Sequence, residues 1–125
     1  MKELVMYRCA ICGNLIFMIE DSGVTPECCG MEMTRVIANT EDAAAEKHVP
    51  VMHREESKVH ILVGELPHPM VPQHYISMVF LLTDRGVYMR RLNPGAAAEA
   101  TFSICPDEEV QSVYVWCNLH GLWKS

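Results

Sequence analysis

The side chains of this chain with the greatest capacity for chemistry are six cysteines and six histidines. Four of the cysteines form two close pairs, Cys9-x-x-Cys12 and the adjacent Cys28-Cys29. Thiolates at such spacing favour a tetrahedral site for zinc or iron. The two-residue gap between Cys9 and Cys12 lets one tight turn aim both sulfurs at one point. The side chains of adjacent residues diverge, so Cys28 and Cys29 should strain an ideal tetrahedral site. The spacing alone leaves a structural zinc knuckle and an iron centre equally open.

A second set of candidate ligands combines imidazoles with one thiol. His48 lies at the mouth of an expected strand, and His68 and His74 lie on a loop that three prolines stiffen. Cys117 and His120 end the last expected strand, separated by two residues, a spacing that can chelate one ion from one turn. We therefore expect these five residues to form a metal site.

Five protein ligands differ from a structural zinc site, which needs four ligands and no vacancy. They indicate a metal that prefers higher coordination and keeps a sixth position open. Imidazole suits iron, copper, zinc and nickel, so ligand type alone does not identify the ion. His53 and His60 lie inside expected strands, and we expect them to be structural or solvated. Cys105 has no partner motif and is expected to be a small buried residue.

Two units must position these ligands, a metal-binding unit over residues 1–37 and a β-sandwich over residues 38–125. Six or seven short strands in the second unit predict an antiparallel sandwich. Asp84-Arg85-Gly86 is expected to be a hairpin turn, and Thr40 could cap a single helical turn in the linker. The β-branched and aromatic runs that predict strands are Leu15–Ile19, Val49–Arg54, Val59–Val63, Tyr75–Thr83, Val87–Leu92, Ala100–Ile104 and Val113–Cys117.

Composition narrows the range of functions. The formal net charge is -6, which argues against a general nucleic-acid role because no basic stripe could neutralise phosphates. The longest apolar run, Met78–Leu82, is too short to span a bilayer. The N-terminal residues include charged side chains and form no signal-peptide core. We therefore expect a cytoplasmic protein without disulfides.

With these motifs in view, the chain resembles the desulfoferrodoxin family. The matching residues run in the family's order from about residue 7 to residue 124, near its spacing. They include Tyr7 to Gly13, Cys28-Cys29-Gly30, Asn39 to Val51, Pro67-His68-Pro69-Met70, His74-Tyr75, and Cys117-Asn118-Leu119-His120-Gly121-Leu122-Trp123-Lys124.

The resemblance implies two iron ions per chain. The first is a desulforedoxin-like Fe(Cys)4 centre on Cys9, Cys12, Cys28 and Cys29. The second is a catalytic iron with the imidazoles of His48, His68, His74 and His120 roughly in a plane and Cys117 axial. Glu46 would occupy the open position in the oxidised resting state, with Lys47 free near it. The resemblance also implies an immunoglobulin-like fold for the second domain, a homodimer, and rubredoxin as the electron donor.

The implied activity is the one-electron reduction of superoxide to hydrogen peroxide. Ferrous iron with four neutral imidazoles and one thiolate carries a local charge near +1, which attracts a small anion although the whole chain is acidic. An axial thiolate favours electron transfer outward, and Lys47 is the candidate for steering and proton supply. An external donor must reset the centre. Two alternatives stay open: an electron carrier without turnover, and a structural zinc protein with a sandwich interaction domain.

Overall fold

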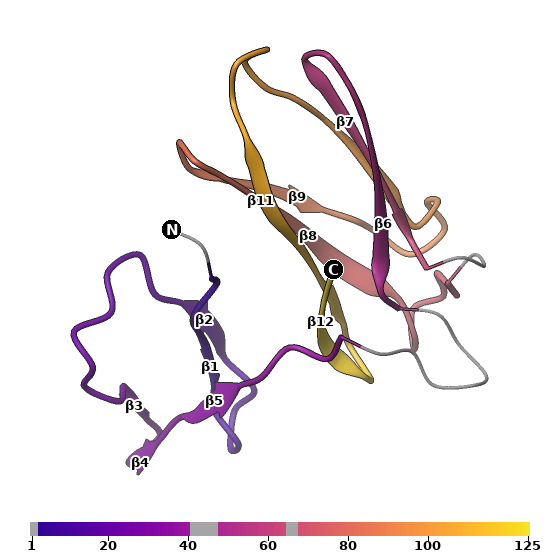
Figure 1. Ribbon diagram of the computed structural model, residues 1–125. Helices are drawn as coiled ribbons and strands as arrows, with labels where there is room; N and C mark the ends of the chain where they lie inside the picture. Colours follow the sequence, from indigo (N-terminus) through magenta and orange to yellow (C-terminus); the bar gives the residue numbers. More distant parts are fainter. Residues whose placement is uncertain (1–2, 41–47, 65–67) are drawn as a thin grey trace. The chain divides into compact units, whose positions relative to one another are not determined.

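The computed structural model describes residues 3–40, 48–64 and 68–125, which fall into two compact units, Glu3–Ile37 and Ala38–Ser125. Every regular element in the described residues is a β-strand (Figure 1). No helix in this part of the chain could cross a membrane. The helical turn expected after Thr40 would fall on residues 41–47, outside the described residues.

The first unit is built on a three-stranded antiparallel sheet in the order β2-β1-β5. A two-stranded ribbon of β3 and β4 accompanies it. Its buried apolar residues are few, and one small cluster of them holds Tyr7, Cys9 and Met33 with partly buried neighbours. So small a core rarely folds a domain below about 40 residues without a metal or disulfides. The strands are β1 (Met6–Arg8), β2 (Leu15–Phe17), β3 (Glu27–Cys28), β4 (Met31–Glu32) and β5 (Thr34–Val36).

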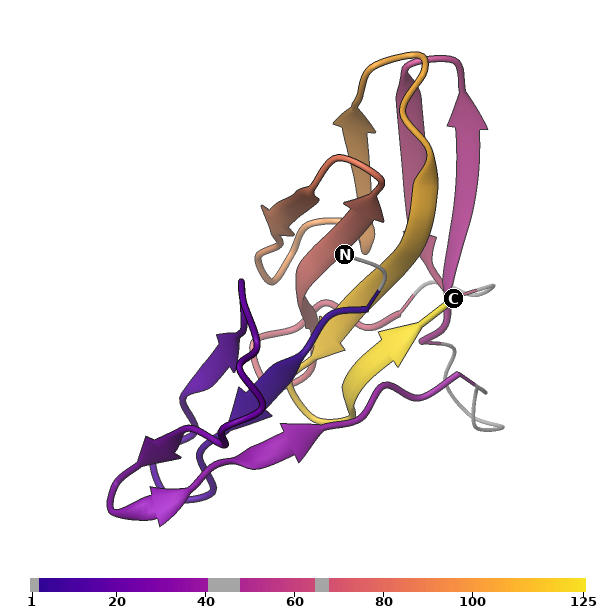
Figure 2. The ribbon, with the colours of Figure 1, turned by 60° about the vertical axis from the view of Figure 1, so that its left-hand side comes forward.

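The second unit is an antiparallel β-sandwich. One sheet has the order β10-β7-β6 and the other has the order β12-β11-β8-β9. The two sheets form facing layers in both orientations (Figures 1 and 2). The strands are β6 (Pro50–Glu55), β7 (Lys58–Val63), β8 (Ile76–Thr83), β9 (Val87–Arg91), β10 (Glu99–Ser103), β11 (Val110–Cys117) and β12 (Gly121–Lys124).

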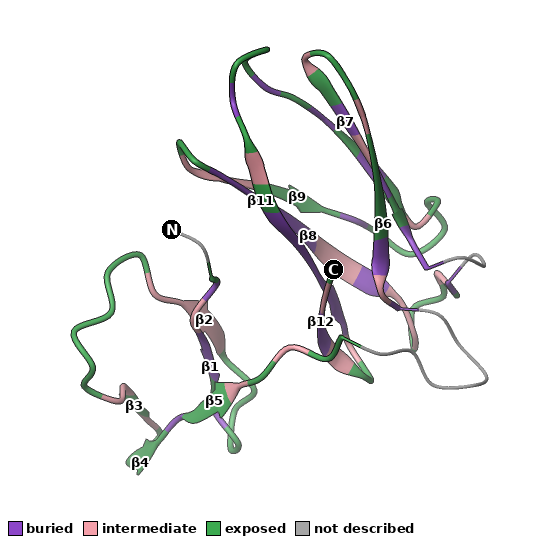
Figure 3. Cartoon of the chain, in the orientation of Figure 1, coloured by how far each residue is buried: buried purple, intermediate pink, exposed green. Residues whose placement is uncertain are grey.

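The core lies between these sheets because apolar side chains alternate along the strands. On β7, Val59, Ile61 and Val63 are buried, whereas the residues between them face outward. They pack in one cluster with residues of the opposite sheet, such as Val79 and Val115. Burial is most continuous along β8 and β11, the central strands of the four-stranded sheet (Figure 3).

The six strands expected in the second unit are confirmed, as is the hairpin turn at residues 84–86 between β8 and β9. The sequence interpretation missed β12, which turns back at Gly121 and pairs with the end of β11. Gly121 has a φ of 82°, a conformation that other residues adopt at a cost.

The expectation for Cys105 is wrong, because this residue is exposed. The chain leaves β10 after Ser103, and Ile104 is the last inward residue before a turn. In that turn the backbone N–H of Cys105 donates to the buried carboxylate of Glu108, 3.3 Å away.

Candidate metal centres

A tight turn after β1 holds the first cysteine pair. The N–H of Gly13 donates to the carbonyl of Cys9 over 3.0 Å, and the N–H of Cys9 donates to the carbonyl of Asn14 over 2.8 Å. Gly13 permits this turn with a φ of 80°. The N–H of Cys12 also points to the sulfur of Cys9, 3.4 Å away. The turn therefore aims both sulfurs to one side.

The four sulfurs of Cys9, Cys12, Cys28 and Cys29 all lie within 4.8 Å of one another. The Sγ atom of Cys28 is 3.6 Å from that of Cys12 and 3.9 Å from that of Cys29. Four thiolates around a tetrahedral ion, with bonds of about 2.3 Å, would be about 3.8 Å apart. A disulfide would need about 2.0 Å, and no two of the six cysteines, all described, form one. The donor set fits a tetrahedral thiolate metal.

The adjacent pair reaches this geometry by a local backbone distortion. Cys29 has a φ of 55°, in the left-handed region that residues other than glycine seldom adopt. This conformation turns the second side chain back toward its neighbour. The strain expected for adjacent ligands is thus taken up by the backbone at Cys29.

The thiols of this group differ in acidity. Backbone hydrogen bonds, first from Cys12 and then from Ile11, lower the pKa of Cys9 to about 6. Hydrogen bonding to Cys12 and then Cys28 raises the pKa of Cys29 to about 12. The lowered pKa of Cys9 favours its thiolate form, whereas metal binding must displace the proton of the less acidic Cys29.

The second group draws its donors from three segments of the sandwich. His48 precedes β6, His68 and His74 lie on the loop before β8, and Cys117 and His120 flank the turn between β11 and β12. One nitrogen or sulfur atom from each of the five lies within 4.8 Å of all the others. With bonds of about 2.1 Å, adjacent octahedral donors would lie about 3.0 Å apart and opposite donors about 4.2 Å apart. The spread of the five atoms fits one ion.

The closest donor distances identify the atoms that face inward. The Sγ atom of Cys117 is 3.6 Å from Nε2 of His68 and 3.7 Å from Nδ1 of His120. The Nδ1 atom of His120 is 3.2 Å from Nε2 of His48. His120 therefore offers the nitrogen nearer its backbone, whereas His48 and His68 offer the more distant one.

The four imidazoles form a ring of edge-to-face neighbours. Going round from His48 through His68, His74 and His120, the centroids are 4.5, 4.7, 5.0 and 4.9 Å apart. The neighbouring planes meet at 62°, 83°, 74° and 73°. The diagonal from His48 to His74 is 6.5 Å, so the corners at His68 and His120 are close to right angles.

Several contacts around the group orient its members. The carbonyl of Pro69 lies 2.7 Å from Nδ1 of His68 and accepts its proton, which leaves the lone pair on Nε2. The indole of Trp123 stacks on His48 at 4.4 Å and 12°, and its N–H donates to the carbonyl of His120 over 3.1 Å.

Asn118 connects the two loops that carry the ligands. Its Oδ1 accepts from the N–H of Tyr75 over 2.9 Å, and its Nδ2 donates to the carbonyl of Gln73 over 2.9 Å. These two backbone groups lie on either side of His74. The sequence interpretation assigned no role to Asn118 or Trp123. The position of Asn118 between two ligands was the available signal.

The group is buried on one side and open on the other. His48 and His68 are 2% and 4% exposed and Cys117 is fully buried, whereas His120 is exposed. The exposed edge of the group is therefore at His120. Glu46 and Lys47 lie outside the described residues. His53 and His60 belong to neither ligand group.

Comparisons with known proteins agree with this architecture. The family model for desulfoferrodoxin matches residues 40–125. A desulfoferrodoxin homolog of Archaeoglobus fulgidus is 38% identical over 124 residues, covering 99% of this chain and 98% of its own. The crystal structure of the superoxide reductase from Treponema pallidum superposes with a TM-score of 0.85 at 32% identity, covering 99% of this chain and 98% of that one. A superoxide reductase from Giardia intestinalis, described as 1Fe, covers 64% of this chain and 95% of its own, with 32% identity and a TM-score of 0.55.

Proposed function

The chain belongs to the desulfoferrodoxin family, and from this premise we propose that it is a superoxide reductase, an oxidoreductase that converts superoxide to hydrogen peroxide. The reaction joins one superoxide anion, one electron and two protons into one molecule of peroxide. The T. pallidum structure, which matches almost the whole chain, carries that name.

The observation that carries this proposal is the set of four imidazoles and one thiolate around a single point, with one edge open to solvent. We assign His48, His68, His74, His120 and Cys117 as the ligands of an iron ion. Iron held by this set would supply the electron to superoxide. The buried Cys117 would be the thiolate ligand of that iron, and the near-square set of four imidazoles would complete the donors that the described residues supply. The stacking of Trp123 and the bonds of Asn118 keep the rings in place during turnover.

Glu46 and Lys47 directly precede His48, so we assign them the remaining roles of the active site. Lys47 would raise the local positive potential, which attracts the anionic substrate, and it would be the candidate proton donor. Glu46 would be a carboxylate ligand of the iron in the oxidised resting state.

We assign the first unit, residues 1–37, a second iron on Cys9, Cys12, Cys28 and Cys29. Four thiolates saturate a tetrahedral ion, so this centre has no position for superoxide. The 1Fe reductase of G. intestinalis supports a reaction confined to residues 38–125. Its match covers 64% of this chain, more than twice the length of the first unit, so most of it lies in the second. We further propose a cytoplasmic homodimer that receives electrons from a rubredoxin-like donor.

The test combines metal analysis with rapid kinetics. The purified chain should hold two irons, and the reduced protein should consume superoxide in stopped-flow mixing with one peroxide formed per electron supplied. Cys117→Ser should abolish this reaction and the thiolate-to-metal absorption of the second centre, since serine is a poor iron ligand. Cys105→Ser is the matched control, because Cys105 is exposed and outside both ligand groups. Zinc in both sites, or oxygen released together with peroxide, would contradict the proposal.

A further inference from the structure

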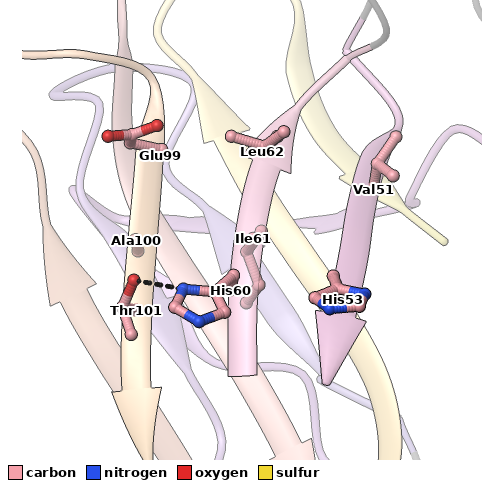
Figure 4. A pocket seen from close by; sticks show the side chains of 8 residues that line it. All are labelled: Val51, His53, His60, Ile61, Leu62, Glu99, Ala100 and Thr101. Carbon is pink, nitrogen blue, oxygen red and sulfur yellow. Dashed lines mark hydrogen bonds between the residues drawn. The ribbon is translucent and has the colours of Figure 1, made fainter. Parts of the chain in front are cut away.

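The outer face of the three-stranded sheet carries a groove of about 330 Å³ that belongs to neither ligand group (Figure 4). Strand alternation brings the side chains that line it to this face. Thr101, His60 and His53 form one row across β10, β7 and β6, because His60 pairs with both of the others. Val51 and Leu62 form an apolar row beside them. The groove therefore places two imidazoles side by side beside an apolar wall.

The two imidazoles lie at the largest separation at which both rings could bind one ion. His53 and His60 are directly opposite each other, with ring centroids 6.4 Å apart and planes inclined by 19°. When a metal–nitrogen bond is about 2.1 Å long, each ring centre lies about 3.2 Å from the metal, so two ligands of one ion are separated by at most about 6.4 Å. The side chain of His53 is 70% exposed, which leaves it room to turn toward its partner.

Each imidazole also has a side-chain oxygen beside one of its two ring nitrogens. The carboxylate of Glu55 is 3.4 Å from Nε2 of His53, and the hydroxyl of Thr101 is 3.0 Å from Nδ1 of His60. When these oxygens accept the ring protons, the lone pairs are left on Nδ1 of His53 and Nε2 of His60. A carboxylate or hydroxyl behind an imidazole is the arrangement that orients histidine ligands in metal sites.

We propose that His53 and His60 bind one divalent ion of the late first-row transition metals, with water completing its coordination. Neutral imidazole suits nickel, copper and zinc, whereas magnesium and calcium prefer oxygen donors. Two protein ligands on an exposed face make an exchangeable site, unlike the two centres enclosed by four and five ligands. The ion joins β6 to β7 from outside the sheet.

Calorimetric titration of the iron-loaded full-length chain with Ni²⁺ tests the site, because Ni²⁺ binds imidazole without oxidising the cysteines. We expect one ion per chain with a micromolar dissociation constant and unchanged iron content. His60→Gln and His53→Gln should each weaken binding at least about tenfold, and Thr101→Val should weaken it by a smaller factor through loss of ring orientation. Lys58→Ala, on the same face one row away, is the matched control and should bind as the unmodified chain does.

The proposal is overturned if no nickel binds at millimolar concentration, or if His60→Gln binds as tightly as the unmodified chain. If iron is lost during the titration and neither glutamine variant changes the nickel uptake, nickel has replaced iron in the two ligand groups instead. Both variants change exposed or half-buried side chains, and their folding is checked by the unchanged iron content.

Discussion

Replacing Asn118 by alanine removes both hydrogen bonds that tie the turn between β11 and β12 to the backbone on either side of His74. The bond that Tyr75 donates is partly buried and the bond to Gln73 is exposed, although both are 2.9 Å long. The backbone N–H of Asn118 still donates to the carbonyl of Tyr75 over 3.2 Å. The variant therefore loosens the position of His74 without separating the two loops.

The size of the effect follows from the burial of each bond. Loss of the partner leaves a half-buried N–H on Tyr75, which costs about 1–3 kcal/mol, whereas water replaces the exposed bond to Gln73 for about 0.5 kcal/mol. We expect Asn118→Ala to lower the free energy of unfolding by about 2 kcal/mol. Displacement of one ligand should also reduce the metal affinity of the five-residue site about 10-fold to 100-fold. Asn118→Asp keeps the acceptor for Tyr75 and loses only the donor, so its loss of stability should be smaller.

Urea unfolding of the metal-free chain measures the first quantity, and competition with a chelator for Fe²⁺ measures the second. Asn93→Ala is the matched control, since Asn93 is exposed and its carbonyl accepts the bond from Ala96. If Asn118→Ala unfolds within about 0.5 kcal/mol of Asn93→Ala and binds Fe²⁺ equally well, the positioning role of Asn118 is refuted.

Cys12→Ser should lose the first metal but keep the second iron and its rate of reaction with superoxide. If the variant keeps the second iron but no longer reacts with superoxide, the two centres depend on each other. Lys47→Ala should slow the reaction with superoxide and flatten its dependence on ionic strength, as expected when a steering charge is removed. Glu46→Ala should leave that rate almost unchanged and alter the absorption spectrum of the oxidised protein. Pulse radiolysis of Lys47→Ala and Glu46→Ala across a salt series measures both rates and distinguishes the steering role of Lys47 from the role of Glu46. Hydrogen bonds, first from Thr83 and then from Tyr88, lower the pKa of the Glu108 carboxyl. The folded pKa is thus below the unfolded value of about 4.3, so this stabilisation is present above pH 4.3 and is lost as the pH falls through the folded pKa. Glu108→Gln should flatten the loss of stability in acid urea titrations, and an unchanged slope would contradict this assignment.

The sequence predicted the sandwich strands because each depends on residue type and short-range spacing, and the residues that it singled out as ligands lie together in two groups. Alternating apolar residues define a strand such as β7 without knowledge of its partners. The missed strand β12 is short and directly follows the turn that carries His120. The two apolar residues Leu122 and Trp123 were too few to predict a strand that pairs with β11. The exposure of Cys105 depends on where the chain leaves β10, and composition carries no signal for that position.

The contacts of Asn118 and Trp123 around the ligands could not be predicted from the sequence for a different reason. Asn118 meets Gln73 and Tyr75 across more than forty residues of chain. The stacking of Trp123 on His48 likewise joins opposite ends of the second unit. Such pairings depend on the register of β11 against β8, which one sequence does not specify.

The two ligand groups also differ in how much chain each must gather. Cys9 and Cys28 are 19 residues apart, whereas His48 and His120 are 72 residues apart. Closing the longer loop costs about 1 kcal/mol more chain entropy, and its ends meet only when the sheet that holds β6 has packed on the sheet that holds β8 and β11. An ion in the first group can accordingly assist folding from an early stage. An ion in the second group cross-links a sandwich that has already formed, so it can stabilise the second unit only at the end of folding.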